Sequence, residues 1–256
     1  QFAYTASFTD GTYGTFLYTP EPRWRQNVGG SWDAAANWTL SIRPGVVHDV
    51  TINPSTSLTV LGPAANASVK SLQVGGSSGA VATIEMTPGG SISSALPIVI
   101  NTTGVVAGSG AFNAPVTNNG ALQPGNLTFN GTLTNNSVIS TNGAIVATTP
   151  LVNAESGVLT GGLTITGDVI NQGTIIANDV SISGTLTNDG SVTVGSGAQA
   201  TFHGNVMQNG TFRVNKVGGI TSSAVVLGAF SGTGGSLGGA TCSSKATFAR
   251  GTVAPV

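Results

Sequence analysis

Short stretches in which apolar and polar residues alternate run along most of the chain, as in Leu163-Thr164-Ile165, Val180-Ser181-Ile182 and Val192-Thr193-Val194. In an extended strand, this alternation places every second side chain on the same face. The pattern therefore predicts many short β-strands, each with one face toward a hydrophobic core.

A repeated unit organises these strands. Each copy has an apolar residue, one further residue, an amide side chain, a turn and another apolar residue. The amides are Asn101, in a weaker first copy, and then Asn118, Asn135, Asn153, Asn171, Asn188 and Gln208, and they are spaced 17 to 20 residues apart. That spacing is about the perimeter of one β-helical coil, so we predict an all-β fold, a parallel β-solenoid with two or three strands per coil.

A solenoid also gives the amides a physical role. Successive coils stack about 4.8 Å apart, so equivalent residues form columns along the axis. Each buried amide can then bond to the amides above and below it and to the turn backbone, which predicts a structural ladder. A β-sandwich or barrel would instead show hairpin signals about every 8–12 residues.

Aromatic residues divide the chain, because nine of the fifteen lie between Phe2 and Trp38. Alternation around Asp10-Gly11 predicts either a hairpin or two separate strands there. We expect three parts: residues 1–45 as an aromatic strand and capping module, 46–230 as the solenoid, and 231–256 as an extended or capping segment.

The aromatic side chains are candidates for two roles. The open end of a solenoid must be covered, and large aromatics suit that task or a subunit contact. Exposed aromatics can instead stack on sugar rings. The candidates for subunit contact or glycan stacking are Phe2, Tyr4, Phe8, Tyr13, Tyr18, Trp24, Trp32 and Trp38.

The pattern Trp32-Asp33…Asn37-Trp38…Pro44, leading into Asp49-Val50-Thr51-Ile52, resembles the start of bacterial exported β-helix repeat proteins of the autotransporter-like and filamentous-haemagglutinin-like type. In such proteins the segment opens or caps a β-helix. The resemblance implies a bacterial protein that is secreted or held at the cell surface. A bias toward Thr, Ser, Asn and Gly and a first residue other than Met, Gln1, agree with an exported and trimmed chain.

Charge excludes several classes of partner. Only 7% of the residues are charged, against about 25% in an ordinary globular domain. No Lys or Arg lies between Lys70 and Arg213, so we expect neither nucleic-acid binding nor a polybasic membrane patch. No apolar run reaches the ~18 residues of a membrane-spanning helix, so we expect no membrane insertion.

Residues that could act in catalysis or bind a metal are few and scattered, so we expect no catalytic residue, metal site or cofactor. The acids of the repeat stand at different offsets from the amide column: Glu85, Glu155, Asp168, Asp179 and Asp189. Asp179 and Asp189 are the least improbable metal or acid positions, and His48 and His203 are far apart. N-glycosylation sequons occur at Asn37, Asn66, Asn101, Asn126, Asn130, Asn135 and Asn209, as expected by chance in a chain so rich in Asn, Ser and Thr.

These observations favour an extracellular structural protein, a subunit of a self-assembling surface fibre or biofilm-matrix filament joined end to end by its terminal strands. Its expected partners are copies of itself and extracellular polysaccharide. The alternatives are a β-helical adhesin or passenger domain that binds glycans and, third, a polysaccharide-degrading enzyme.

Overall fold

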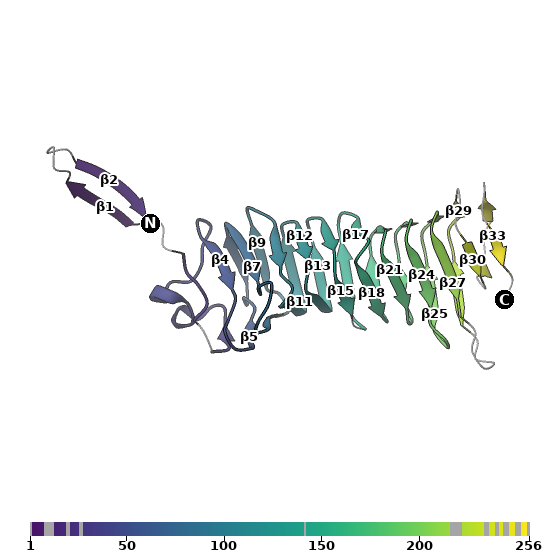
Figure 1. The fold of residues 1–256 in the computed structure, drawn as a ribbon, viewed down its shortest axis with the longest axis horizontal. Coiled ribbons are helices and arrows are strands. Elements are labelled where there is room, and N and C mark those ends of the chain that lie inside the picture. Colours follow the sequence, from purple (N-terminus) through teal and green to yellow (C-terminus); the bar gives the residue numbers. More distant parts are fainter. Residues whose placement is uncertain are drawn as a thin grey trace.

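A computed structural model describes residues 2–7, 13–18, 21–25, 28–140, 142–215, 222–232, 236–238, 241–242, 246–248 and 252–254. The chain winds into a parallel β-solenoid whose coils stack in a rod (Figure 1), which confirms the predicted fold class. In the described ranges the helical segments are two short 3-10 turns, η1 (Ala35–Asn37) and η2 (Thr39–Ser41).

One face of the rod is an 11-stranded parallel sheet to which each coil contributes one strand. Its strands in order are β4 (Asp49–Ile52), β7 (Ser71–Val74), β10 (Ile98–Ile100), β12 (Val116–Asn118), β14 (Leu133–Asn135), β17 (Leu151–Asn153), β20 (Val169–Asn171), β23 (Leu186–Asn188), β26 (Val206–Gln208), β29 (Phe230–Gly232) and β32 (Ala246–Phe248). We call it the ladder face.

Two further faces complete each coil. The second face contains β3 (Gly30–Ser31), β5 (Leu58–Leu61), β8 (Ala82–Met86), β11 (Gly104–Asn113), β13 (Ala121–Phe129), β15 (Val138–Ser140), β18 (Val158–Gly161), β21 (Thr174–Ala177), β24 (Ser191–Val194), β27 (Thr211–Val214), β30 (Ser236–Gly238) and β33 (Thr252–Ala254). The third face contains β6 (Asn66–Val69), β9 (Ser91–Ser94), the later parts of β11 and β13, β16 (Ala144–Ala147), β19 (Thr164–Thr166), β22 (Ser181–Ile182), β25 (Gln199–Phe202), β28 (Ser223–Val226) and β31 (Thr241–Cys242). In most coils separate strands form these two faces, but β11 and β13 are each one continuous strand through that corner, with a β-bulge between them.

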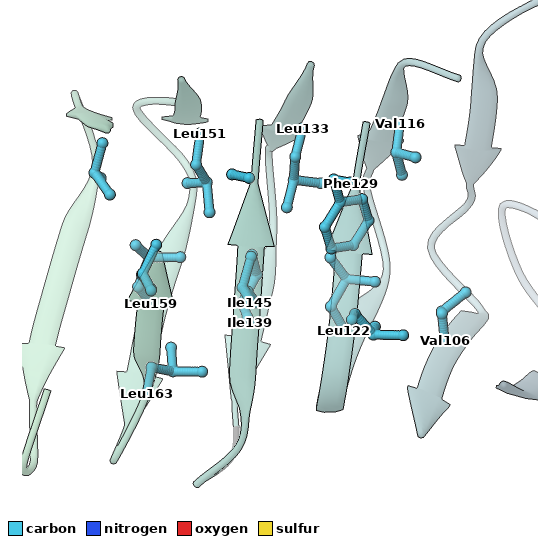
Figure 2. Close-up of a cluster of buried hydrophobic side chains, with 14 of the residues drawn as sticks. Val106, Val116, Leu122, Phe129, Leu133, Ile139, Ile145, Leu151, Leu159 and Leu163 are labelled. Carbon is cyan, nitrogen blue, oxygen red and sulfur yellow. The ribbon is translucent and has the colours of Figure 1, made fainter. Parts of the chain in front are cut away.

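The core consists of columns of aliphatic side chains inside the coils. Val106, Leu122, Ile139 and Leu159 follow one another in register and are 0 to 1% exposed. Figure 2 shows these side chains between the faces of successive coils. Burying one such side chain contributes roughly 1.5–3 kcal/mol before the entropy cost of ordering the chain. The repeat thus stabilises every coil through its neighbours.

The N-terminal strands β1 (Phe2–Ser7) and β2 (Tyr13–Tyr18) pair antiparallel as a hairpin, the first of the two arrangements that the sequence left open. They form a separate two-stranded sheet, which lies beyond the first coil in Figure 1. Among the aromatic candidates, Phe8 lies outside the described residues, and Phe2, Tyr4, Tyr13 and Tyr18 lie within the hairpin.

The C-terminal part corrects the predicted division of the chain. The strands β30 to β33 pair in parallel with strands of the preceding coils, so the described parts of residues 231–256 continue the solenoid and are not a separate extended or capping segment. These strands could not be recognised from the sequence, because a short strand such as Ser236–Gly238 contains one large apolar residue, too few to show alternation.

Candidate functional site

The amide column lies at the inner edge of the ladder face. Asn118, Asn135, Asn153, Asn171 and Asn188 are 0% exposed and Gln208 is 1% exposed. Each Nδ2 donates to the side-chain oxygen of the next amide: Asn118 to Asn135 at 2.7 Å, Asn135 to Asn153 at 2.8 Å, Asn153 to Asn171 at 2.7 Å, Asn171 to Asn188 at 2.6 Å and Asn188 to Gln208 at 2.8 Å. The structure thus contains the amide ladder that the regular spacing of these residues predicts.

The backbone uses the remaining hydrogen-bonding capacity of the ladder. Asn153 Nδ2, for example, also donates to the carbonyl of Gly157 at 3.1 Å and to that of Thr174 in the next coil at 3.2 Å. Buried amides without such partners would be costly. The ladder therefore fixes the register of the turn on each coil, and it is a structural element.

Asn101 is not part of this ladder, which corrects its sequence assignment. Strand β10 pairs so that Ile100, not Asn101, lies beside Asn118. Asn101 is half-buried, and its Nδ2 donates to the carbonyl of Gly75 at 3.0 Å. The apolar side chain of Ile100 occupies the inward position of β10, so the amide ladder begins one coil later than predicted.

The other end of the ladder is Gln208. Its Nε2 is buried and has no hydrogen-bond partner among the described residues. Gly232 lies against it in the next coil, and a Cβ there would come 1.8 Å from the Gln208 carbonyl oxygen. The close backbone approach admits only glycine at that position, so the amide column ends.

Three tryptophans close the N-terminal end of the rod, in a segment that we call the tryptophan cap (residues 21–25 and 28–45). Trp24, Trp32 and Trp38 are 5%, 1% and 0% exposed and belong to the same hydrophobic core as the first coils. The Trp38 ring meets the other two edge to face, at 4.9 Å between centroids in each case. Two of the indole N–H groups donate to backbone carbonyls, Trp24 to Val28 at 2.7 Å and Trp38 to Trp32 at 2.8 Å.

This burial corrects one of the two roles proposed for the tryptophans. A ring that stacks on a sugar must present a face to solvent, and these rings present almost none. Trp24, Trp32 and Trp38 therefore serve as capping residues and not as a glycan platform. The cap also extends two faces of the rod. Strand β3 pairs with β5 of the second face, and Arg23 forms a parallel bridge with Thr51 of the ladder face.

The acidic side chains in the repeat serve the turns between coils. Asp168 accepts a hydrogen bond from the Thr185 N–H at 2.7 Å, and Asp179 accepts one from the Gln199 N–H at 2.9 Å. Asp189 accepts one from the Asn209 amide at 2.8 Å. Within the described ranges, no three His, Cys, Asp or Glu side chains converge as metal ligands would.

Titratable groups gather near the first coils. Lys70 Nζ lies 2.6 Å from Asp49, and Ser71 also donates to Asp49 at 2.6 Å. These hydrogen bonds, chiefly that from Lys70, hold the pKa of Asp49 below its usual value, and the same contact raises the pKa of Lys70. Burial lowers the pKa of His48, whose Nδ1 accepts the Gly45 N–H at 2.8 Å.

His203, the second histidine, is exposed at the other end of the rod. Its Nε2 lies 3.3 Å from the Ser181 hydroxyl on the neighbouring coil. His48 and His203 thus belong to separate environments, and the structure does not bring them together.

Two hollows lie on the described surface of the rod. The cap hollow, of about 300 Å³, lies beside the tryptophan cap and includes the ion pair between Arg43 and Asp33, 3.4 Å apart. The corner hollow, of about 480 Å³, lies where β11 and β13 pass between the second and third faces. Sequence reasoning missed the corner hollow. The signal was the missing turn between the two strand segments of each of these coils.

Comparison with known family models, curated proteins and solved structures finds no match to the chain. The resemblance to exported β-helix proteins therefore rests on the residues that carry it. None of the helices in the described part of the chain has the length and apolar character needed to cross a bilayer.

Proposed function

We propose that the protein is an extracellular structural subunit that assembles head to tail into a surface fibre. The observation that carries this proposal is the difference between the two ends of the rod. At one end the tryptophan cap packs against the first coils, whereas at the other the last described strands, β31, β32 and β33, continue the regular coils. Two unlike, complementary ends make a heterologous contact, and such contacts generate open filaments.

The N-terminal end carries the tryptophan cap in place of a further regular coil. The rings of Trp24, Trp32 and Trp38 are buried in the same hydrophobic core as the first coils. Beyond them lies the β1–β2 hairpin, which has its own two-stranded sheet. An isolated two-stranded hairpin is marginally stable in water, so it gains stability by joining a larger sheet.

The C-terminal end offers such a sheet. In the described part of the chain, β31, β32 and β33 each pair on one side only, with β28, β29 and β30. No described strand pairs with their other edges, and such an edge is a template for strand addition. We propose that the hairpin of one copy adds to this edge of the next.

The surface supports the same assignment. From Ser71 to Phe212 the chain has no Lys or Arg and five acids, so copies would meet with little charge to desolvate. The resemblance to exported β-helix proteins favours an extracellular location and bacterial origin. Extracellular polysaccharide would be the matrix around such fibres.

The test is to remove the pairing of the hairpin while leaving the rod intact. Thr5 and Thr15 are register partners, and a proline at either position removes a backbone N–H. The variant Thr5→Pro/Thr15→Pro should keep a far-ultraviolet circular dichroism spectrum typical of β-structure but form no filaments in electron micrographs. The matched control Thr5→Val/Thr15→Val should form them. Filaments from the proline variant would contradict the proposal.

A second candidate function, a glycan-binding adhesin, is favoured by the cap hollow. Arg43 is exposed on its rim and Asp33 accepts from Arg43 and from the Ala64 N–H. A polar pair on the wall of a hollow is typical of sites that bind sugar hydroxyls. Retention on immobilised polysaccharide that is lost in Arg43→Ala, and kept in an Arg25→Ala control, would favour this function over the fibre.

A further inference from the structure

The structure distinguishes among the seven sequons, which the sequence alone cannot do. N-glycosylation uses the side-chain nitrogen of Asn, so an exposed nitrogen without a hydrogen bond to break is the one most ready to react. In six sequons it is already engaged: Asn37 Nδ2 donates to Ser31 at 2.9 Å, Asn66 to Ser68 at 3.2 Å, Asn101 to Gly75 at 3.0 Å, Asn130 to Asn113 at 2.7 Å, Asn135 to Asn153 at 2.8 Å and Asn209 to Asp189 at 2.8 Å. One sequon remains.

That sequon is Asn126-Leu127-Thr128 in β13. Asn126 is exposed, and its side chain makes no hydrogen bond with the described residues. Leu127 between them is 0% exposed, so the period of the strand places Asn126 and Thr128 together on the outer face. The acceptor amide and the hydroxyl of the sequon therefore reach the same side of the rod.

A β-bulge presents this side chain. The register between β11 and β13 shifts after Gly108, so that Gly125 is an extra residue and Asn126 pairs with Ser109. A bulge changes the direction in which the next side chain points, and bulges are frequent at functional positions. The bulge occurs in the two coils that lack a corner turn.

The missing turns leave room beside Asn126. The corner hollow is bounded by the turn of the preceding coil, Pro88 to Gly90, and by residues of β11 and β13. Its lining includes Ser91, Ser109, Asn113, Asn126 and Thr128 and has no charged side chain. A volume of about 480 Å³ lies within the roughly 300–1,000 Å³ of small-molecule sites. A neutral saccharide fits this lining of hydroxyls, amides and glycine backbone.

We propose that Asn126 is an N-glycan attachment site and that the corner hollow holds the first sugars of the glycan. The step joins Asn126 Nδ2 to the anomeric carbon of a saccharide carried on a lipid diphosphate donor. Nδ2 loses one proton, the anomeric carbon–oxygen bond breaks, and the diphosphate leaves with the bonding electrons, so no oxidant or reductant is needed. An oligosaccharyltransferase of the source cell performs the transfer. The proposal uses the extracellular location of the proposed function but not its filaments.

The test is peptide mass spectrometry of the protein isolated from its source cells. Trypsin is unsuitable because no Lys or Arg lies between Ser71 and Phe212, but cleavage after Glu85 and Glu155 releases residues 86–155. That fragment contains four of the sequons. Electron-transfer fragmentation should place a hexose or N-acetylhexosamine mass on Asn126.

Variants produced in the same cells separate the outcomes. Asn126→Gln and Thr128→Ala should each remove the added mass, and the control Asn130→Gln should retain it. An unmodified fragment 86–155 from source cells, or a glycan on another sequon of the Asn126→Gln variant, would overturn the proposal. Because Asn126 makes no hydrogen bond with the described residues, Asn126→Gln should fold, and filaments from it would show that the fibre does not depend on the glycan.

Discussion

Removal of one amide from the middle of the ladder should destabilise the solenoid far more than removal of an amide from its surface. Asn153 is 0% exposed, accepts from Asn135 at 2.8 Å and donates to Asn171 at 2.7 Å. In Asn153→Ala, both neighbours lose their ladder partner in a buried position. Each unsatisfied buried group costs about 1–3 kcal/mol, so we expect the free energy of unfolding to fall by about 2–5 kcal/mol.

The matched control makes the same substitution on the outside of the rod. Asn130 also bonds to an amide of a neighbouring coil, Asn113, at 2.7 Å, but it is exposed. Water can replace that bond, so Asn130→Ala should change the free energy of unfolding by about 0.5 kcal/mol or less.

Guanidinium titrations followed by circular dichroism measure both variants against the parent protein. Because a solenoid can unfold in parts, the transition midpoints and slopes should be compared together. Equal shifts for Asn153→Ala and Asn130→Ala would refute the reasoning, because they would mean that the buried ladder contributes no more than a surface bond.

Three further predictions concern the cap and the turns. Trp38→Ala removes a 0% exposed ring, so the free energy of unfolding should fall by about 3–5 kcal/mol in the same titration. Gly75→Ala should destabilise far more than Gly79→Ala in thermal melts. Both have positive φ, 75° and 102°, but a Cβ on Gly75 would lie 2.2 Å from the Gly104 nitrogen, and one on Gly79 would have nothing within 4 Å. Equal melting temperatures would contradict the crowding argument. Burial lowers the pKa of His48, so as the pH falls below about 6.5 the unfolded chain binds this proton more readily than the folded one. Stability of the first coils should therefore fall as the pH drops below that value, as read by hydrogen exchange, and His48→Gln should remove that part of the pH dependence.

The sequence predicts the repeat well because a solenoid imposes one rule on every coil. A buried Asn column requires an amide at a fixed place in each turn, and that requirement is visible as spacing. The assignment of Asn101 was displaced by one residue because Val99-Ile100-Asn101 matches the repeat in letters, whereas strand pairing selects Ile98-Val99-Ile100. When two registers both place hydrophobic side chains inside the coil, only pairing with the neighbouring coil distinguishes them.

The role of the tryptophans could not be predicted from sequence for a different reason. A cap and a glycan platform require the same aromatic residues, and they differ only in whether the rings face the core or solvent. Trp32 and Trp38 face the core. The corner hollow could not be predicted from the sequence either, because it depends on how Gly108 and Gly125 shift the pairing of β11 and β13.

Negative-stain electron microscopy of the protein from its source shows whether this rod is a fibre subunit with unlike ends. Eleven stacked strands at about 4.8 Å per coil give a solenoid about 50 Å long. We expect unbranched polar filaments whose axial repeat is at least that length, because the cap and hairpin extend each subunit. Dispersed single rods at the concentrations found in the source would contradict that expectation.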